Sequence, residues 1–421
     1  MNGTVSGDAM KRREFISGMG AVGVGMFTGC LSDRMKGVEG CRYPGWTPGE
    51  LDIHFIQTGV GEQTFFILPD GTTMLLDCGD MYRPQYLPLI PRRPTDGRLG
   101  GEWVSRYVQR LIRERSIDYF LLSHWHADHC GKPSLRSEKT PDGRVVCGIT
   151  RLAEDFSIRN YFDHQYPRAG VYGMNPDEDS LAMMREWIPF MGRRCGMRPH
   201  AFSVGAVNQI SMLRGGRQRC ADFRIVNLFS NCVYWDGSRK VDYAPRYFKN
   251  HPDADGKIPE NSLSMGIRVE YGPFRAYFGG DIDLPDYENR LGPIVGPVDV
   301  CKTNHHSCPS SMGAEFCRSV RAQAYMTSVW SPNQITDKNL VNMSSRDLYP
   351  GERVILPGFL PDVKKCDYAG RKFMDDLLPV QGHSVFKVAQ GGGAFDLFVL
   401  TDEDESMTVL HHRQFKSGAN A

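Results

Sequence analysis

The stretch Ser123-His124-Trp125-His126-Ala127-Asp128-His129 decides how this chain is interpreted. Its last six residues hold three imidazoles and one carboxylate, directly after the apolar run 119–122. Neutral imidazole and carboxylate are ligands that zinc, iron and similar divalent ions prefer, and burying so many polar groups without partners would be costly. The stretch therefore predicts a metal-binding turn at the end of a buried strand.

The composition is that of an ordinary globular protein. The 421 residues are 41% hydrophobic and 24% charged, with a formal net charge of +1. Such a chain can bury a large core in one big domain or two ordinary ones. Its net charge gives no general reason to expect nucleic acid or an anionic membrane as a partner.

The first 30 residues resemble an export signal. Lys11-Arg12-Arg13-Glu14-Phe15-Ile16 is similar to a twin-arginine signal, and Phe27-Thr28-Gly29-Cys30 is similar to a lipoprotein box. We therefore expect residues 1–30 to be a signal, with a lipid anchor at Cys30, and residues 31–49 to be a linker. The protein is then exported by a bacterial cell to the periplasm or cell envelope. The rest of the sequence has no apolar run long enough to span a bilayer, so no transmembrane domain is expected.

The remaining chain predicts one layered α/β domain over residues 50–410. Strands are predicted at 53–57, 64–68, 73–77, 119–122, 263–271, 274–279, 298–303, 384–389 and 395–400, and helices at 101–115 and 181–194. Residues 133–260 are expected to form a long irregular insert, a candidate for a lid that selects the substrate.

Polar side chains follow three of these strands. The histidine stretch follows the first, Asp281 follows the second, and His305 and His306 follow the third. In a layered fold such strand ends meet at one edge, so the ligands can converge. Two metal ions about 3.5–4 Å apart lower the pKa of a shared water and stabilise attacking and leaving oxygens. The pattern thus predicts hydrolytic chemistry with two divalent ions, zinc first, with manganese or iron as alternatives.

The chain resembles hydrolases of the metallo-β-lactamase fold, an αββα four-layer sandwich. His124-x-His126-x-Asp128-His129 matches the signature of that superfamily, and Gly280-Asp281 matches its bridging aspartate. Within it, the chain is most similar to the hydrolase domain of ComEC-type DNA-uptake proteins. The motifs that carry this similarity are Gly59-Val60-Gly61, Pro69-Asp70-Gly71 through Gly79, Asn261-Ser262-Leu263-Ser264 and Asp299-Val300-Cys301-Lys302.

The sequence departs from the family pattern at two places. Asn261 stands in the region where most members have a histidine. Either Asn261 is a weak ligand or a structural cap, or a water molecule binds the metal in place of the histidine. His164, His200 or His251 is an alternative source of the missing imidazole. The subgroup's His-His-Gly-Ser reads His305-His306-Ser307-Cys308, which leaves open which imidazole binds metal.

The resemblance implies a role for each candidate residue. His124 and His126 would hold one ion, with Asn261 or water. Asp128, His129 and either His305 or His306 would hold the other, and Asp281 would bridge the two. Asp128 would also orient the attacking water. Whichever of His305 and His306 is not a ligand would donate a hydrogen bond to the scissile group or hold a ligand in place. Asp77 is expected to hydrogen-bond the histidine stretch, and Asp283 to cap the start of a helix.

Three functions stay open at this stage. The first is hydrolysis of a phosphodiester or phosphomonoester, with nucleic acid or a small phosphorylated molecule as substrate. The second is hydrolysis of a lactam, lactone or thioester, against which an aspartate rather than a cysteine at position 281 argues. The third is a non-enzymatic envelope binding protein with a degenerate metal site.

Overall fold

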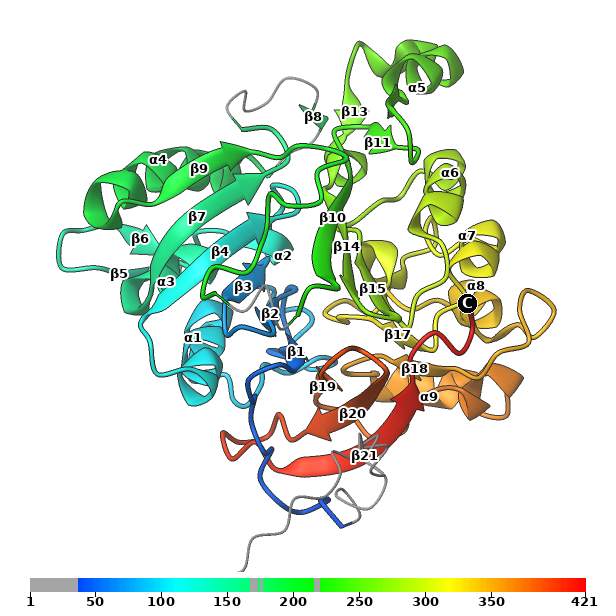
Figure 1. The fold of residues 1–421 in the computed structure, drawn as a ribbon. Helices are drawn as coiled ribbons and strands as arrows, with labels where there is room; N and C mark the ends of the chain where they lie inside the picture. The colour runs from blue at the N-terminus through cyan, green and yellow to red at the C-terminus, as the bar shows by residue number, and fades with distance from the viewer. Residues whose placement is uncertain (1–36, 167–172, 175–176, 216–219) are drawn as a thin grey trace, which may run out of the picture. The chain divides into compact units, whose positions relative to one another are not determined.

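The first of two large β-sheets carries the histidine stretch. The computed structural model describes residues 37–166, 173–174, 177–215 and 220–421. In them this sheet has nine strands (Figure 1), in the order β21 (Val409–Lys416), β20 (Ala394–Leu400), β19 (His383–Val388), β1 (Leu51–Phe55), β2 (Thr64–Ile67), β3 (Thr73–Leu76), β4 (Ser116–Leu122), β7 (Ser157–Asp163) and β9 (Arg198–Ala201). Neighbours are antiparallel from β21 to β3 and parallel from β3 to β9.

The second sheet has the same two-part character. Its eight strands within the described residues are β12 (Lys240–Asp242), β11 (Val233–Trp235), β10 (Phe223–Ser230), β14 (Gly266–Tyr271), β15 (Phe274–Phe278), β16 (Val300–Lys302), β17 (Ala324–Met326) and β18 (Val354–Leu356). The strands from β12 to β15 are antiparallel, and those from β15 to β18 are parallel. Both sheets therefore have a parallel half, whose strands end at a common edge.

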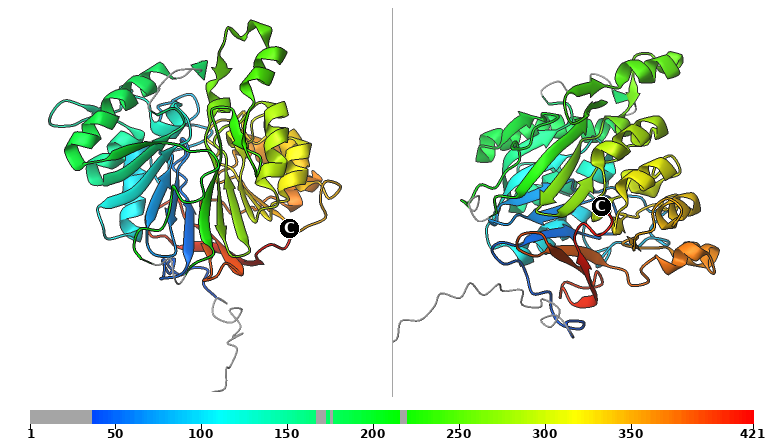
Figure 2. Two further views of the ribbon diagram at one scale, coloured as in Figure 1. Left: turned by 45° about the horizontal axis from the view of Figure 1, so that its top comes forward. Right: turned by 45° about the vertical axis from the view of Figure 1, so that its right-hand side comes forward.

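Helices cover the outer faces of both sheets (Figures 1 and 2). α1 (Gly100–Leu111), α3 (Gly148–Asp155) and α4 (Glu178–Cys195) lie on the first sheet, and α6 (Pro285–Val295), α7 (Ala314–Val320), α8 (Asp337–Ser344) and α9 (Asp362–Tyr368) lie on the second. The shorter elements are α2 (Ala127–Cys130), α5 (Ala244–Asn250), the 3₁₀ turns η3 (Pro252–Ala254), η4 (Glu260–Leu263), η5 (Asn304–Ser307) and η6 (Lys372–Asp375), and the strands β5 (Glu138–Lys139), β6 (Val145–Val146), β8 (Gly173–Met174) and β13 (Ile258–Pro259).

Aromatic side chains fill the space between the sheets. Phe278 of β15 packs against Phe55 of β1 and Phe66 of β2, with ring centroids 5.8 and 4.9 Å apart. Its neighbour Tyr277 points to the other face of the sheet, as the two-residue strand repeat requires, and lies 5.8 Å from Phe316 of α7. The layers therefore run helices, sheet, sheet, helices, and the αββα prediction is confirmed.

The elements predicted around the histidine stretch and Asp281 agree with the structure to within a few residues. The strand predicted at 119–122 is the buried end of β4, and the pair predicted at 263–271 and 274–279 is β14 and β15. The helices predicted at 101–115 and 181–194 are α1 and α4. Continuous apolar runs predicted these strands well because both of their faces are covered.

The expectation of an irregular insert at 133–260 was wrong. β7 and β9 extend the first sheet beyond β4, and β10 pairs with β14 in the second. Within β10, Ile225 is buried in the hydrophobic core between the two sheets. Leu228 and Phe229 are buried in the core between the second sheet and its helices. Much of this segment is thus part of the sandwich itself, while its role as a lid stays a prediction.

The predicted signal lies outside the described residues. This holds for the twin-arginine-like stretch, for Cys30 and for linker residues 31–36. Within the described part of the chain, no helix is both long and apolar enough to cross a membrane.

Candidate metal centre

Side chains from three strand ends meet at one edge of the sandwich. Asp128 and His129 follow β4, Asp281 follows β15, and His306 follows β16. One ligand atom from each of these four buried residues lies within 4.8 Å of every other. The convergence expected from the sequence is therefore present, and we call these four residues the central cluster.

The nitrogen and oxygen atoms of the central cluster are close enough to bind the same ion. His129 Nε2 lies 3.1 Å from Asp281 Oδ2 and 3.5 Å from Asp128 Oδ2. His306 Nε2 lies 3.1 Å from Asp128 Oδ2 and 3.2 Å from Asp281 Oδ2. Two imidazole nitrogens thus face the same two carboxylate oxygens.

The two remaining histidines of the stretch lie next to the central cluster. His124 Nε2 is 3.1 Å from His126 Nδ1 and 4.0 Å from Asp281 Oδ2. Asp281 Oδ2 therefore lies within reach of both groups of imidazoles. Its Oδ1 atom is 3.2 Å from the ammonium of Lys302, so only one of its oxygens faces the histidines.

Hydrogen bonds fix which nitrogen of two rings carries the proton. His306 Nδ1 donates to the Ser328 carbonyl at 2.9 Å, and His129 Nδ1 donates to Asp77 at 2.8 Å. In a neutral ring the Nε2 atom then directs a lone pair at a carboxylate oxygen, which is repulsive unless a cation lies between them. Since carboxylate and imidazole are ligands of divalent metals, the donor set fits such an ion.

The electrostatics of the central cluster favour bound cations. Burial opposes a charged His306, but the carboxylates of Asp281 and Asp128 outweigh burial and raise its pKa to about 9. The same balance raises the pKa of His129 well above its ordinary value. Burial and the neighbouring His129 lower the pKa of His124. His129 and His306 therefore hold protons that a metal ion would displace.

Asp77 supports the histidine stretch from the end of β3. It accepts the backbone N–H of Ser123 through Oδ1 and the Ser123 hydroxyl through Oδ2, both at 2.7 Å, in addition to the His129 ring. The predicted hydrogen bonding of Asp77 is confirmed. Close packing holds the stretch from the other side, since a Cβ at Gly79 would lie 1.8 Å from the Asp128 carbonyl oxygen.

The turn that carries the histidine doublet has unusual backbone geometry. His305, His306 and Ser307 have φ angles of 44°, 49° and 59°, in the left-handed region that L-residues rarely adopt. The buried Glu288 of α6 anchors the turn by accepting the Asn304 amide at 2.9 Å and the backbone N–H groups of Met312 and Gly313. This geometry turns His306 into the central cluster and leaves His305 outside it.

His305 instead belongs to a polar group at the mouth of the site. Its Nε2 atom is 3.2 Å from the amide of Asn261, which donates to Asp283 at 3.0 Å. Asn261 is therefore not one of the residues brought into the central cluster. The expectation that Asp283 caps a helix was wrong, because Leu284 is the N-cap of α6 and Asp283 accepts from Asn261 and Ser262.

The three alternative histidines lie elsewhere. His164 pairs with Glu260 at 2.9 Å, His200 contacts Asn160 at 3.0 Å, and His251 stacks on Tyr247 with ring centroids 4.3 Å apart. None of them is in the central cluster. Glu260 also accepts the backbone N–H of Trp125 at 2.9 Å, so it holds the histidine stretch in place.

Sequence analysis missed Glu62 and the role of Lys302. The Lys302 ammonium is buried, 3.1 Å from Glu62 and 2.5 Å from the Gly280 carbonyl. Glu62, Asp77 and His129 form a second buried group that could hold a metal ion. Lys302 ends one of the motifs that carry the family resemblance, and Glu62 directly follows another. Their contact joins the start of the domain to β16, which no local pattern reveals.

The central cluster opens into a hollow of about 1060 Å³ that includes open solvent. Asp128, Asp281 and His305 line its floor, together with His126 and Asn261. Its rim carries Arg83 and Trp330, and also Lys132 with Asp177, Glu178 and Asp179. A substrate can therefore reach the candidate ligands from solvent.

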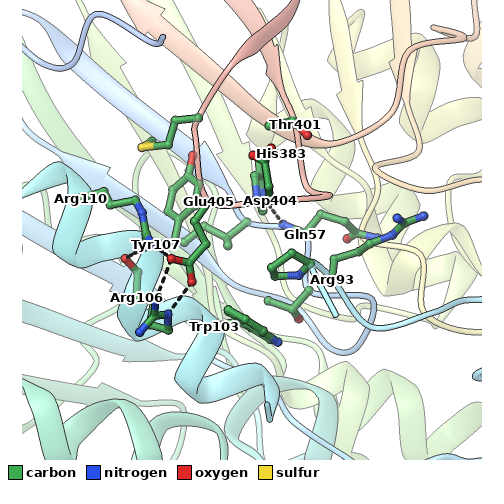
Figure 3. A pocket seen from close by; sticks show the side chains of 14 residues that line it. Gln57, Arg93, Trp103, Arg106, Tyr107, Arg110, His383, Thr401, Asp404 and Glu405 are labelled. Carbon is green, nitrogen blue, oxygen red and sulfur yellow. Dashed lines mark hydrogen bonds and ion pairs between the residues drawn. The ribbon is translucent and has the colours of Figure 1, made fainter. Parts of the chain in front are cut away.

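A second hollow has three arginines among the residues that line it (Figure 3). Arg93, Arg106 and Arg110 line it, with Gln57, Tyr107, His383, Asp404 and Glu405. Glu405 pairs with both Arg106 and Arg110, and Arg93 Nε lies 3.7 Å from Asp402. We call this region the arginine hollow.

Comparisons with known proteins give low similarity. No family model and no curated protein matches the chain. Solved structures that are similar to it include the following three. A presumed metal-dependent hydrolase from Parabacteroides distasonis ATCC 8503 has a TM-score of 0.31 and 13% identity, with 72% of this chain and 92% of that chain covered. The short form of human tRNase Z has a TM-score of 0.28 and 13% identity, with 66% and 92% covered. A long-form RNase Z from yeast has a TM-score of 0.34 and 11% identity, with 75% and 41% covered. Similarity at this level assigns no activity to this chain.

Proposed function

We propose that this chain is a metal-dependent hydrolase. The observation that carries the proposal is the arrangement of His129 and His306, whose Nε2 atoms face the carboxylates of Asp128 and Asp281 while their Nδ1 protons are used elsewhere. Burying such a set is unfavourable unless a cation completes it. Without a metal ion, the balancing positive charge would have to come from Lys302 and from additional protons on the two imidazoles.

The proposed ligands form two groups around Asp281. Asp128, His129 and His306 would hold one divalent ion, and His124 and His126 the other. Zinc is the first candidate, with manganese and iron next. When bound, such ions lower the pKa of a water molecule and stabilise negative charge on the reacting oxygens.

The surrounding residues have positioning roles in this proposal. Asp77 fixes the His129 ring through its Nδ1 proton, and Lys302 holds Asp281 through Oδ1. His305 lines the hollow beside Asn261, where it can contact the scissile group of a bound substrate. Such outer contacts typically change metal affinity or activity by 10–100-fold when they are removed.

A phosphodiester or phosphomonoester is the proposed substrate. Arg83 on the rim supports an anionic substrate, since a guanidinium group is a common partner of phosphate. The similarity of the sequence motifs to ComEC-type hydrolase domains adds nucleic acid to the substrates to be tested.

The test is a substrate panel with the metal-loaded full chain. We expect turnover of bis(p-nitrophenyl) phosphate and none of the lactam nitrocefin. His129→Ala should abolish turnover, while His251→Ala, which alters a histidine stacked on Tyr247, should retain it. Nitrocefin turnover would favour lactam hydrolysis. Metal binding without any turnover would favour a binding protein.

Export and lipidation are part of the same proposal. The twin-arginine-like stretch and Cys30 support a location in the periplasm or cell envelope. Cell fractionation should find the protein in the envelope, and Cys30→Ala should release it from the membrane fraction. A cytoplasmic location of the unaltered chain would contradict this part.

A further inference from the structure

Arg83 and Trp330 form one wall of the hollow above the central cluster. Both residues line it, and the Arg83 guanidinium lies 5.3 Å from the centre of the Trp330 ring. That distance is within the range of a cation–π contact. The wall therefore presents a positive group beside the proposed reaction site.

Trp330 has a fixed position. Its ring packs against the small apolar cluster of Val60, Met81 and Ala127, and its indole nitrogen lies 3.4 Å from His306 Nε2. Its backbone N–H donates to Gln334 at 2.7 Å. Because the ring packs against this cluster and Gln334 holds its backbone, the ring can hold the Arg83 head group in one place.

Arg83 and Lys132, the two cations on the rim, differ in whether they have a carboxylate partner. Lys132 lies 3.0 Å from Asp177 and 3.2 Å from Asp179, so its charge is balanced. Arg83 Nε contacts the sulfur of Met81 at 2.9 Å, and within the described residues no carboxylate lies within ion-pairing distance of its guanidinium. Its positive charge is thus available to a ligand in the hollow.

We propose that Arg83 binds a second negative group of the substrate, next to the group that reacts, and that Trp330 positions it. The inference deepens the proposed function and rests on it. It names the substrate as an ester with two separate anionic groups, the second a phosphate or a carboxylate. A guanidinium donates to either through two parallel N–H groups, and one such contact is worth roughly tenfold in affinity.

Three probes that contain no ester bond test this inference. Phenylphosphonate carries one anionic group, whereas 3-carboxyphenylphosphonate and benzene-1,3-bisphosphonate add a second. Isothermal titration of the zinc-loaded full chain should show about tenfold tighter binding of at least one two-anion probe than of phenylphosphonate. Preference for the carboxylate or for the bisphosphonate identifies which second group the substrate carries.

Variants assign the preference to the wall. Arg83→Gln should reduce the tenfold ratio to about one. Trp330→Leu should reduce it in part, and Trp330→Phe, which keeps an aromatic face, should restore most of it. The matched control is Arg98→Gln, because Arg98 stacks on Trp103 at 5.5 Å in another part of the molecule; it should keep the ratio.

The outcomes separate this inference from the proposed function. Equal affinity of the unaltered protein for all three probes, or an unchanged ratio in Arg83→Gln, overturns the role of Arg83 alone. A preserved ratio together with no phosphoester turnover overturns the phosphoester function alone. Failure of every probe to bind overturns both.

Discussion

The central cluster and the arginine hollow are both groups of charged side chains, but they reach electrical balance in different ways. In the arginine hollow each of the three arginines has a carboxylate partner from residues 402–405. Figure 3 shows Glu405 between Arg106 and Arg110. In the central cluster, two imidazoles and two carboxylates share their contacts, and only Lys302 supplies a permanent positive charge. A group of charges is a candidate metal site where its positive charge depends on imidazole protons that a metal ion can displace.

Asp281→Asn is expected to produce the largest effect. Asparagine keeps the shape but removes the negative charge that faces His129 and His306, so metal affinity should fall at least about 100-fold and hydrolysis should be lost. Metal analysis after equilibrium dialysis measures the first effect, and phosphoester turnover the second.

Asp118→Asn is the matched control for that change. Asp118 is also fully buried, but Arg159 and Arg214 neutralise it at 3.1 and 3.0 Å. The control should lower stability and keep the metal. Equal metal content in both variants would remove the distinction between the two kinds of charge cluster.

Removing the metal should destabilise the protein by a few kcal/mol. A ligand present at 100 times its dissociation constant stabilises the folded state by about 2.7 kcal/mol, so a chelator should lower the melting temperature. Chelator treatment of His129→Ala should have little effect, because that variant has already lost a ligand. An identical melting temperature of the unaltered protein with and without chelator would count against a metal in the folded state.

His383 in the arginine hollow should make stability depend on pH. Burial, with a smaller contribution from His54, lowers its pKa to about 3, and its Nδ1 atom accepts the backbone N–H of Gln57 at 2.9 Å. Because the unfolded chain takes up the proton near pH 6.5, this contribution is complete above that pH and is lost as the pH falls below it. The loss is about 1.4 kcal/mol per pH unit.

Urea unfolding at pH 7.5 and 5.5 measures this dependence. The unaltered protein should lose about 1.4 kcal/mol more than His383→Gln between the two pH values, since glutamine does not titrate. Equal losses in both proteins would show that His383 is not buried in its neutral form.

Ser307→Gly should give the smallest effect, a stabilisation of about 0.5–1 kcal/mol. Ser307 has a φ of 59°, and its buried hydroxyl has no hydrogen-bond partner within the described residues, so glycine removes both penalties. Ser345→Gly, at an ordinary φ of −66°, should instead destabilise. Thermal unfolding of the two variants gives the sign of each change.

Local sequence patterns were enough to predict a layered α/β domain and the convergence of polar side chains at its strand ends, whereas the αββα order of layers was implied by the family resemblance. The apolar run of β4 and the polar residues after it are adjacent in the chain, and Asp281 follows an equally clear strand. The choice between His305 and His306 was beyond such patterns, because it depends on the left-handed turn anchored by Glu288. The contact between Glu62 and Lys302 was missed for the same reason, since it joins residues far apart in sequence.

The most direct test of the central claim is anomalous diffraction from crystals grown with zinc, recorded at the zinc absorption edge. We predict two peaks, one among Asp128, His129, Asp281 and His306 and one beside His124 and His126. Data from the unaltered protein with no anomalous peak near Asp281, or with zinc bound only elsewhere, would contradict the account.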